Sequence, residues 1–185
     1  EYQRALNLLD EMRRCGLVPN EITYSSVINA CAKGGEYQRA LNLLEVMQRC
    51  GLVPNEITYN SVINACAKGG ESQRALNLLD EMRSRGLVPD KITYSSVINA
   101  CATGGKWQCA LNLLEEMQRC GLVPDAITYN SVINACAKGG ESQRALNLLD
   151  EMRSRGLVPD EITYCSVINA AFKCGEWPRA LDLFD

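Results

Sequence analysis

Hydrophobic and polar positions along the chain follow a pattern that recurs every 35 residues. In the copy at residues 21–55, the first half carries hydrophobic residues spaced i, i+3, i+4 and i+7, which is the spacing of one helix face. These residues are Tyr24, Val27, Ile28 and Cys31. A Pro-Asn pair precedes the stretch as a helix start signal, and the glycine pair at 34–35 stops it. The pattern therefore predicts a first helix, helix A, over about residues 21–33.

The second half of the copy predicts another helix, helix B, over about residues 36–50. Its apolar stripe consists of Tyr37, Ala40, Leu41, Leu44 and Met47. Gly51 ends this helix, and Pro54 closes the connection to the next copy. Each copy is thus a helical hairpin that cannot bury its apolar faces alone, so neighbouring copies must stack on it.

Four full copies fill residues 21–55, 56–90, 91–125 and 126–160, between partial copies at 1–20 and 161–185. We therefore expect an all-α solenoid of about eleven helices that forms a single array over residues 1–185. The segments 57–90 and 127–160 are identical, which indicates either recent duplication or a designed, consensus-like array.

Composition narrows the function classes. Hydrophobic residues make up 46% of the chain, which is enough for a continuous core, and no apolar run approaches the length of a membrane helix. The net charge of −3 argues mildly against nucleic-acid binding unless positive charge gathers on one face.

The ten cysteines do not predict disulfides. Cys31, Cys66, Cys101 and Cys136 occupy equivalent positions, and stacked helices lie about 8–10 Å apart, beyond the reach of about 7 Å for a disulfide. We expect them to be reduced core residues. Because the chain has no histidine and no Cys-x-x-Cys pair, we expect neither a metal site nor a cofactor, and no catalytic constellation indicates an enzyme.

The repeat carries I-T-Y-[NS]-S-V-I-N-A-C-A-K-G-G at its front, A-L-N-L-L-x-x-M behind it and G-L-V-P-[DN] at its end. In period and motifs it resembles the pentatricopeptide repeat over the entire chain. The resemblance implies a right-handed superhelix that binds single-stranded RNA, with one base read per repeat. It also implies a role in RNA processing, editing, stability or translation in mitochondria or chloroplasts.

The resemblance further implies that the fifth and the last residue of each repeat read the base. These pairs are Ser25 with Asn55, Asn60 with Asp90, Ser95 with Asp125, and Asn130 with Asp160. Read by the family's pattern, the pairs spell A-U-G-U from 5′ to 3′, whereas Cys165 departs from the pattern and its base is undetermined. The alternative is that the Asn and Asp residues merely cap the following helices.

Two further sets recur once per repeat. The isoleucines at the second position would sandwich the bases by resemblance, or else pack between repeats; they are Ile22, Ile57, Ile92, Ile127 and Ile162. The lysines at the end of helix A would face phosphates, or else complement the helix dipole; they are Lys33, Lys68, Lys138 and Lys173, with Thr103 as the exception.

The leading interpretation is therefore a sequence-selective array that binds single-stranded RNA. The alternatives are a helical-repeat scaffold for protein–protein interaction and a designed scaffold without a selected function. Neither terminal repeat looks like a polar cap, so we expect either end-to-end self-association or an origin in a longer array.

Overall fold

The computed structural model describes residues 1–175, and all regular structure in this part of the chain is α-helical. It divides into two compact units, 1–100 and 101–185, whose boundary falls inside one helix. The first unit contains α1 (Tyr2–Arg14), α2 (Glu21–Lys33), α3 (Tyr37–Arg49), α4 (Glu56–Lys68), α5 (Ser72–Ser84) and most of α6 (Lys91–Thr103). The second contains α7 (Trp107–Arg119), α8 (Ala126–Gly139), α9 (Ser142–Ser154) and α10 (Glu161–Lys173).

The expected all-α hairpin array is confirmed, and ten of the eleven expected helices lie among the described residues. The remaining helix B would fall after residue 175, outside the described residues. Helix A of the first full repeat spans residues 21–33 as predicted, and helix B begins at Tyr37 and ends at Arg49. Gly35 follows helix A with a φ of +76°, a conformation that glycine adopts without the Cβ penalty of other residues.

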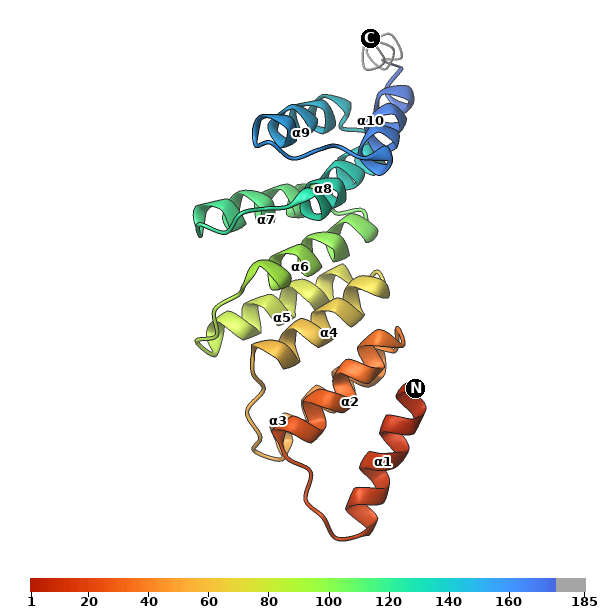
Figure 1. Ribbon diagram of the computed structural model, residues 1–185, viewed down its shortest axis with the longest axis vertical. Helices are drawn as coiled ribbons and strands as arrows, with labels where there is room; N and C mark the ends of the chain where they lie inside the picture. The colour runs from red at the N-terminus through yellow and green to blue at the C-terminus, as the bar shows by residue number, and fades with distance from the viewer. Residues whose placement is uncertain (176–185) are drawn as a thin grey trace. The chain divides into compact units, whose positions relative to one another are not determined.

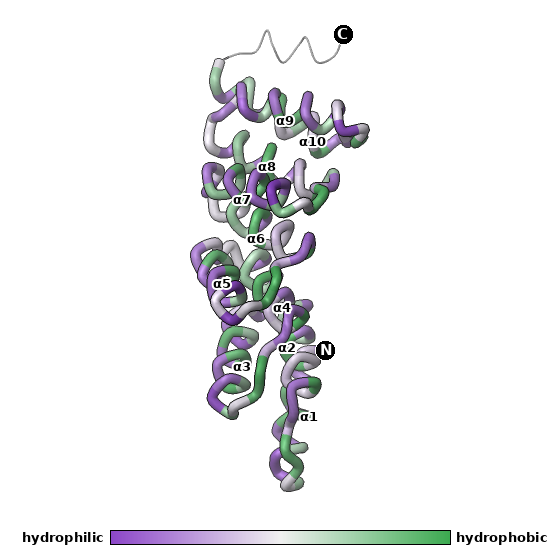
Figure 2. Tube along the Cα trace, turned by 90° about the vertical axis from the view of Figure 1, so that its left-hand side faces the viewer, coloured by the Kyte–Doolittle hydropathy of each residue, from purple (hydrophilic) through white to green (hydrophobic). Residues whose placement is uncertain are grey.

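Helices A pack against both helices B and other helices A of the same unit (Figure 1). In the first unit, α2 packs against α3 of its own repeat and against α4, the next helix A. In the second unit, α8 packs against α7, α9 and α10. Each helix carries both hydrophobic and hydrophilic residues along its length (Figure 2). Stacking one hairpin on the next therefore buries the apolar stripes that a single hairpin would expose.

The predicted stripe of helix A is buried in full in the first repeat, and Ile28 and Cys31 have no exposed surface. The stripe of helix B needed a correction. Ala40, Leu44 and Met47 are buried as expected, but Tyr37 and Leu41 are only half-buried. Leu43, which was not in the predicted stripe, is 8% exposed and belongs to the core. Helix B therefore turns a slightly different face to its neighbours than simple periodicity indicated.

The tyrosine at the fourth position of helix A joins three helices through its hydroxyl. Tyr59 donates to Glu81 Oε1 at 2.8 Å, and Gln48 of the preceding helix B donates to the same oxygen at 2.7 Å. Tyr129 makes the same contact with Glu151 in the second unit, at 2.8 Å. Burial, followed by this hydrogen bond, raises the pKa of Tyr129 to about 12. The hydroxyl therefore stays protonated and remains a donor between repeats.

Candidate nucleic-acid interface

The fifth residue and the last residue of a repeat lie 30 positions apart in the sequence and meet in the structure. Asn60 Nδ2 donates to Asp90 Oδ1 at 3.3 Å. In the second unit, Asn130 Nδ2 lies 3.1 Å from both carboxylate oxygens of Asp160. The last residue is the N-cap of the next helix A, so the stacking of helices A brings it beside the fifth residue of its own repeat.

In the first full repeat the pair is joined through a third residue. Ser25 Oγ lies 2.7 Å from Thr58 Oγ1, and Thr58 in turn donates its hydroxyl to Asn55 Oδ1 at 2.9 Å. Asn55 is the N-cap of α4 and also accepts the backbone N–H of Thr58. Ser25 and Asn55 are therefore two ends of one short chain of hydrogen bonds.

The two other members of the predicted set keep the same places within their own helices. Ser95 is half-buried on α6. Asp125 is the N-cap of α8 and accepts the backbone N–H of Thr128 at 3.0 Å. Cys165, which departs from the pattern, is exposed on α10.

The last residue of a repeat also caps the following helix A, as the alternative interpretation expected. Asn20, Asn55, Asp125 and Asp160 all accept a backbone N–H from the threonine three residues later. Capping alone explains the choice of Asn or Asp at this position. It does not explain the fifth residues, which lie inside helix A, where serine and asparagine are poor helix formers.

Two of the acidic members, Asp90 and Asp160, are held ionised. Burial alone would raise the pKa of Asp90, but hydrogen bonds from the Thr93 backbone and hydroxyl and from Asn60 outweigh it and lower the pKa. The backbone N–H of Thr163, followed by its hydroxyl, lowers the pKa of Asp160. Both side chains are exposed carboxylates at neutral pH, and a carboxylate can only accept hydrogen bonds.

The isoleucines at the second position of the repeats are largely exposed. Their exposed fractions are 75% for Ile22, 68% for Ile57, 63% for Ile92, 73% for Ile127 and 63% for Ile162. Packing between repeats, which was the alternative interpretation, does not cover them. Each lies three residues before a fifth-position residue, on the same side of helix A. The interface thus places an apolar surface beside each fifth-position residue.

The lysines at the end of helix A reach across to the preceding repeat. Lys68 Nζ donates to the carbonyl oxygen of Ala32 at 3.2 Å, and Lys138 Nζ donates to that of Ala102 at 3.3 Å. These carbonyls belong to the last turn of the preceding helix A, whose negative dipole end the ammonium group complements. Lys33, Lys68, Lys138 and Lys173 are all exposed. Because an ammonium group has three donors, one carbonyl leaves the others available.

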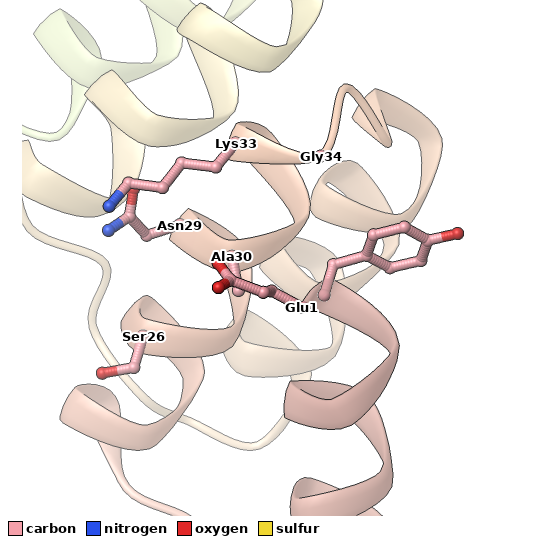
Figure 3. A pocket seen from close by; sticks show the side chains of 7 residues that line it. Glu1, Ser26, Asn29, Ala30, Lys33 and Gly34 are labelled. Atoms are coloured by element: carbon pink, nitrogen blue, oxygen red, sulfur yellow. The ribbon is translucent and has the colours of Figure 1, made fainter.

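A hollow of about 460 Å³ lies between α1 and α2, with Lys33 and Asn29 extending side by side along one wall (Figure 3). Ala30 on α2 is half-exposed there, whereas its equivalent Ala65 on α4 is fully buried against the preceding repeat. The hollow therefore corresponds to the position where, in later repeats, helix A of the preceding repeat packs.

Sequence reasoning missed the threonine at the third position of the repeat. Thr93 Oγ1 lies 2.6 Å from Asn60 Oδ1 and 2.9 Å from Asp90 Oδ1, so it touches both members of the pair. A capping box in the motif Asn/Asp-x-x-Thr was the available signal. It indicated only a contact within one helix end, because the partner on the preceding helix A lies 33 residues away.

Within residues 1–175, no helix is long and apolar enough to cross a membrane, and no group of three metal-ligating side chains comes together.

Comparison with known proteins agrees with this architecture. A family model described as the pentacotripeptide-repeat region of PRORP matches residues 1–106 and 28–184. The chain belongs to the pentatricopeptide-repeat family. A search of curated proteins gave no match.

Several solved structures are similar to the chain. The crystal structure of the pentatricopeptide repeat protein PPR10 from maize has a TM-score of 0.77 and 35% identity, over 100% of this chain and 26% of that one. PPR10 in complex with an 18-nucleotide psaJ RNA element has a TM-score of 0.74 and 29% identity, over 94% of this chain and 26% of that one. This chain thus spans about a quarter of the length of PPR10.

A more distant similarity concerns the fold alone. The pentatricopeptide-repeat domain of Arabidopsis thaliana protein-only RNase P 1, in complex with tRNA, has a TM-score of 0.74 and 17% identity, over 88% of this chain and 87% of that one.

Proposed function

We propose that the chain binds single-stranded RNA in a sequence-selective manner, with one nucleotide per repeat and a preferred core of A-U-G-U read from 5′ to 3′. The observation that carries the proposal is the meeting of the fifth and last residues, as in Asn60 with Asp90 and Asn130 with Asp160. Neither contact is needed for a helix to form, and each presents polar atoms beside an exposed isoleucine. The RNA complex of PPR10 supports the same class of ligand.

In this proposal, the exposed isoleucines of neighbouring repeats hold each base by its faces. The polar pair reads the base edge, and the lysines at the ends of helices A lie along the phosphates. Stacking contributes about 1–3 kcal/mol per base. Four complete pairs thus give roughly 4–12 kcal/mol before ordering costs, so we expect a dissociation constant in the micromolar range or weaker.

The sharpest test exchanges one reading residue. Asn60→Ser converts the second pair to serine with aspartate, so the preferred base at the second position should change from uracil to guanine. Fluorescence anisotropy with labelled AUGU and AGGU oligomers measures the exchange. Asn77→Ser makes the same chemical change at an exposed site on helix B and should leave the preference for AUGU intact.

Equal affinity of the unaltered chain for AUGU and a scrambled oligomer would contradict the proposal. Absence of RNA binding even at low salt would favour the peptide-binding scaffold instead.

The cellular role follows from the family resemblance alone. We propose that the protein serves RNA processing, stability or translation in mitochondria or chloroplasts. One similar structure is described as a nuclear proteinaceous RNase P from A. thaliana, so the fold is compatible with more than one compartment. Fractionation of cells that express the natural protein, followed by immunodetection, tests the assignment.

A further inference from the structure

In three repeats, the threonine at the third position is buried at the point where two helices A meet. Thr58, Thr93 and Thr163 have no exposed surface. A threonine near a helix start has an ordinary explanation, because its backbone N–H is capped by the residue before the helix. Thr93 N donates to Asp90 Oδ1 at 2.8 Å, and Asp90 N donates back to Thr93 Oγ1 at 3.1 Å.

Capping does not account for the second contact that each hydroxyl makes. Thr93 Oγ1 lies 2.6 Å from Asn60 Oδ1, and Thr163 Oγ1 lies 2.5 Å from Asn130 Oδ1. Thr58 Oγ1 lies 2.7 Å from Ser25 Oγ. In each case the hydroxyl leaves its own helix and touches the fifth residue of the preceding repeat. The same contact thus occurs in both compact units, with two different kinds of fifth residue.

We infer that this threonine is the positioning residue of the base-reading pair, because its hydroxyl decides which donors and acceptors the pair offers to a base. The inference rests on the proposed RNA-binding function. It adds a third residue, contributed by the following repeat, to each of the two-residue pairs.

The hydrogen-bonding protons of the second repeat determine the polarity of its pair, that is, which donors and acceptors the pair presents to a base. The ionised Asp90 only accepts, so the amide of Asn60 must turn its NH₂ group toward that carboxylate and its oxygen toward the Thr93 hydroxyl. A reversed amide would set two acceptor oxygens against each other. The pair is then left with one unused N–H on Asn60 and an exposed carboxylate. Uracil and guanine both present a carbonyl oxygen next to an N–H and match this donor and acceptor, whereas cytosine does not, and the family's pattern selects uracil.

The first full repeat has the opposite polarity. Thr58 has a single hydroxyl proton, and it donates this proton to Asn55 Oδ1 at 2.9 Å. Both contacts are satisfied when Thr58 donates to Asn55 and Ser25 donates its own proton to Thr58, which leaves the serine lone pairs as acceptors. The Asn55 oxygen is occupied by Thr58, so its NH₂ group remains as a donor. Adenine, with an amino group next to a ring nitrogen acceptor, matches this arrangement.

The test compares two substitutions that differ in one hydroxyl. Thr93→Val keeps the shape of the side chain and the backbone N–H but removes the hydroxyl, whereas Thr93→Ser keeps the hydroxyl. Affinities are measured for four oligomers that differ only at the second base: AUGU, ACGU, AAGU and AGGU. Thr93→Val should reduce the preference for uracil over cytosine roughly 5- to 10-fold, the scale of one hydrogen bond, and Thr93→Ser should keep it.

Thr163→Val is the matched variant in the second unit, and it should reduce selectivity only at the fourth base. It also carries the test if Thr93→Val does not fold, as judged by helical circular dichroism. An unchanged uracil preference in folded valine variants would overturn the inference. So would an equal loss of affinity for all four oligomers, which is what a merely structural role predicts.

The experiments distinguish a failure of the base-reading function from a failure of the positioning role of the threonine. If the unaltered chain has no base preference, both the reading function and the positioning role fall. If the unaltered chain prefers uracil and the valine variants retain that preference, only the positioning role falls.

Discussion

Individual cysteines fall into two chemically distinct groups according to their place in the repeat. Cys31, Cys66, Cys101 and Cys136 are completely buried on helices A, as the sequence predicted. Cys15, Cys50, Cys120, Cys165 and Cys174 are exposed, and Cys109 is half-buried. All ten are free thiols.

Buried thiols couple the stability of the fold to pH. Burial raises the pKa of Cys66 and Cys136 to about 11 and that of Cys101 to about 12, against about 8.5 in an unfolded chain. Between these values the unfolded state loses protons that the folded state keeps, so stability falls as pH rises. We expect the urea midpoint to be constant below about pH 8 and to decline between about pH 9 and 11.

Replacing the three thiols is the matched control for this pH dependence. The variant with Cys66→Ala, Cys101→Ala and Cys136→Ala should show a flatter decline over the same range, although its midpoint is lower throughout because of the lost methylene-sized volume. An equally steep decline in both proteins would assign the effect to other groups, such as the tyrosines.

At the scale of the helix pair, an aromatic ring on one helix B depends on a glycine in the next repeat. A Cβ at Gly69 would lie 2.6 Å from Cδ1 of the Tyr37 ring, and one at Gly34 would lie 2.7 Å from the same atom of Tyr2. Arg74 covers the Tyr37 ring from 5.6 Å. The last described repeat has Cys174 at the glycine position, and the preceding helix B has Ser142 in place of the ring.

The close approach of Gly69 to the Tyr37 ring predicts a double-mutant cycle. Gly69 has an ordinary helical φ of −82°, so backbone strain does not forbid alanine there. Gly69→Ala should nevertheless destabilise the protein by about 1–3 kcal/mol, because the Tyr37 ring must move. In a Tyr37→Ser background the same substitution should be neutral or stabilising by about 0.4–1 kcal/mol. Denaturant unfolding of the four proteins measures the coupling, and simple additivity would show that the ring does not matter.

Sequence reasoning worked best for features carried by one helix. The bounds of α2, its buried stripe and its capping by Asn20 follow from local spacing and cap chemistry. Contacts between repeats were harder to predict, because they depend on how two helices are rotated against each other. This explains why Leu43 was missed and why Lys68 was not expected to bind Ala32. It also explains why the role of Thr93 was missed.

The pairing of the fifth and last residues came from family resemblance, because nothing in the local pattern indicates that Asn60 and Asp90 touch. The base that each pair prefers is a prediction of the same kind. The structure supplies the contact, and the binding experiments above supply the preference.

At the scale of the whole molecule, an acidic protein that binds RNA must rely on locally gathered positive charge. The net charge is −3, and each full repeat except the one with Thr103 carries a lysine at the end of helix A. If these lysines face phosphates, the logarithm of the binding constant should fall linearly with the logarithm of salt concentration, by about 0.7 per phosphate neutralised on a single strand.

Lys68→Gln should therefore reduce the salt slope by about 0.7 and weaken binding to all oligomers equally. Arg49→Gln removes the same charge from an exposed site on helix B and should leave the slope unchanged. Anisotropy titrations at several salt concentrations distinguish the two. Identical slopes for Lys68→Gln and the unaltered chain would restrict this lysine to its contact with the Ala32 carbonyl.

Self-association is the remaining prediction at this scale. We expect a second molecule to dock at the hollow between α1 and α2, where Ala30 is only half-buried. Sedimentation velocity over a range of concentrations measures this, and a strict monomer at high concentration would count against it.

The same hollow bears on how such proteins can be lengthened. A repeat joined at the front would cover Ala30 and give Lys33 the backbone partner that Lys68 already has. The contacts of Ala30 and Lys33 with a preceding repeat do not involve the residues that read a base. The third-position threonine is the exception, because its hydroxyl contacts the fifth residue of the preceding repeat. We therefore expect repeats to be exchangeable as modules. Each new repeat must carry the third-position threonine, whose hydroxyl contacts the fifth residue of the repeat before it.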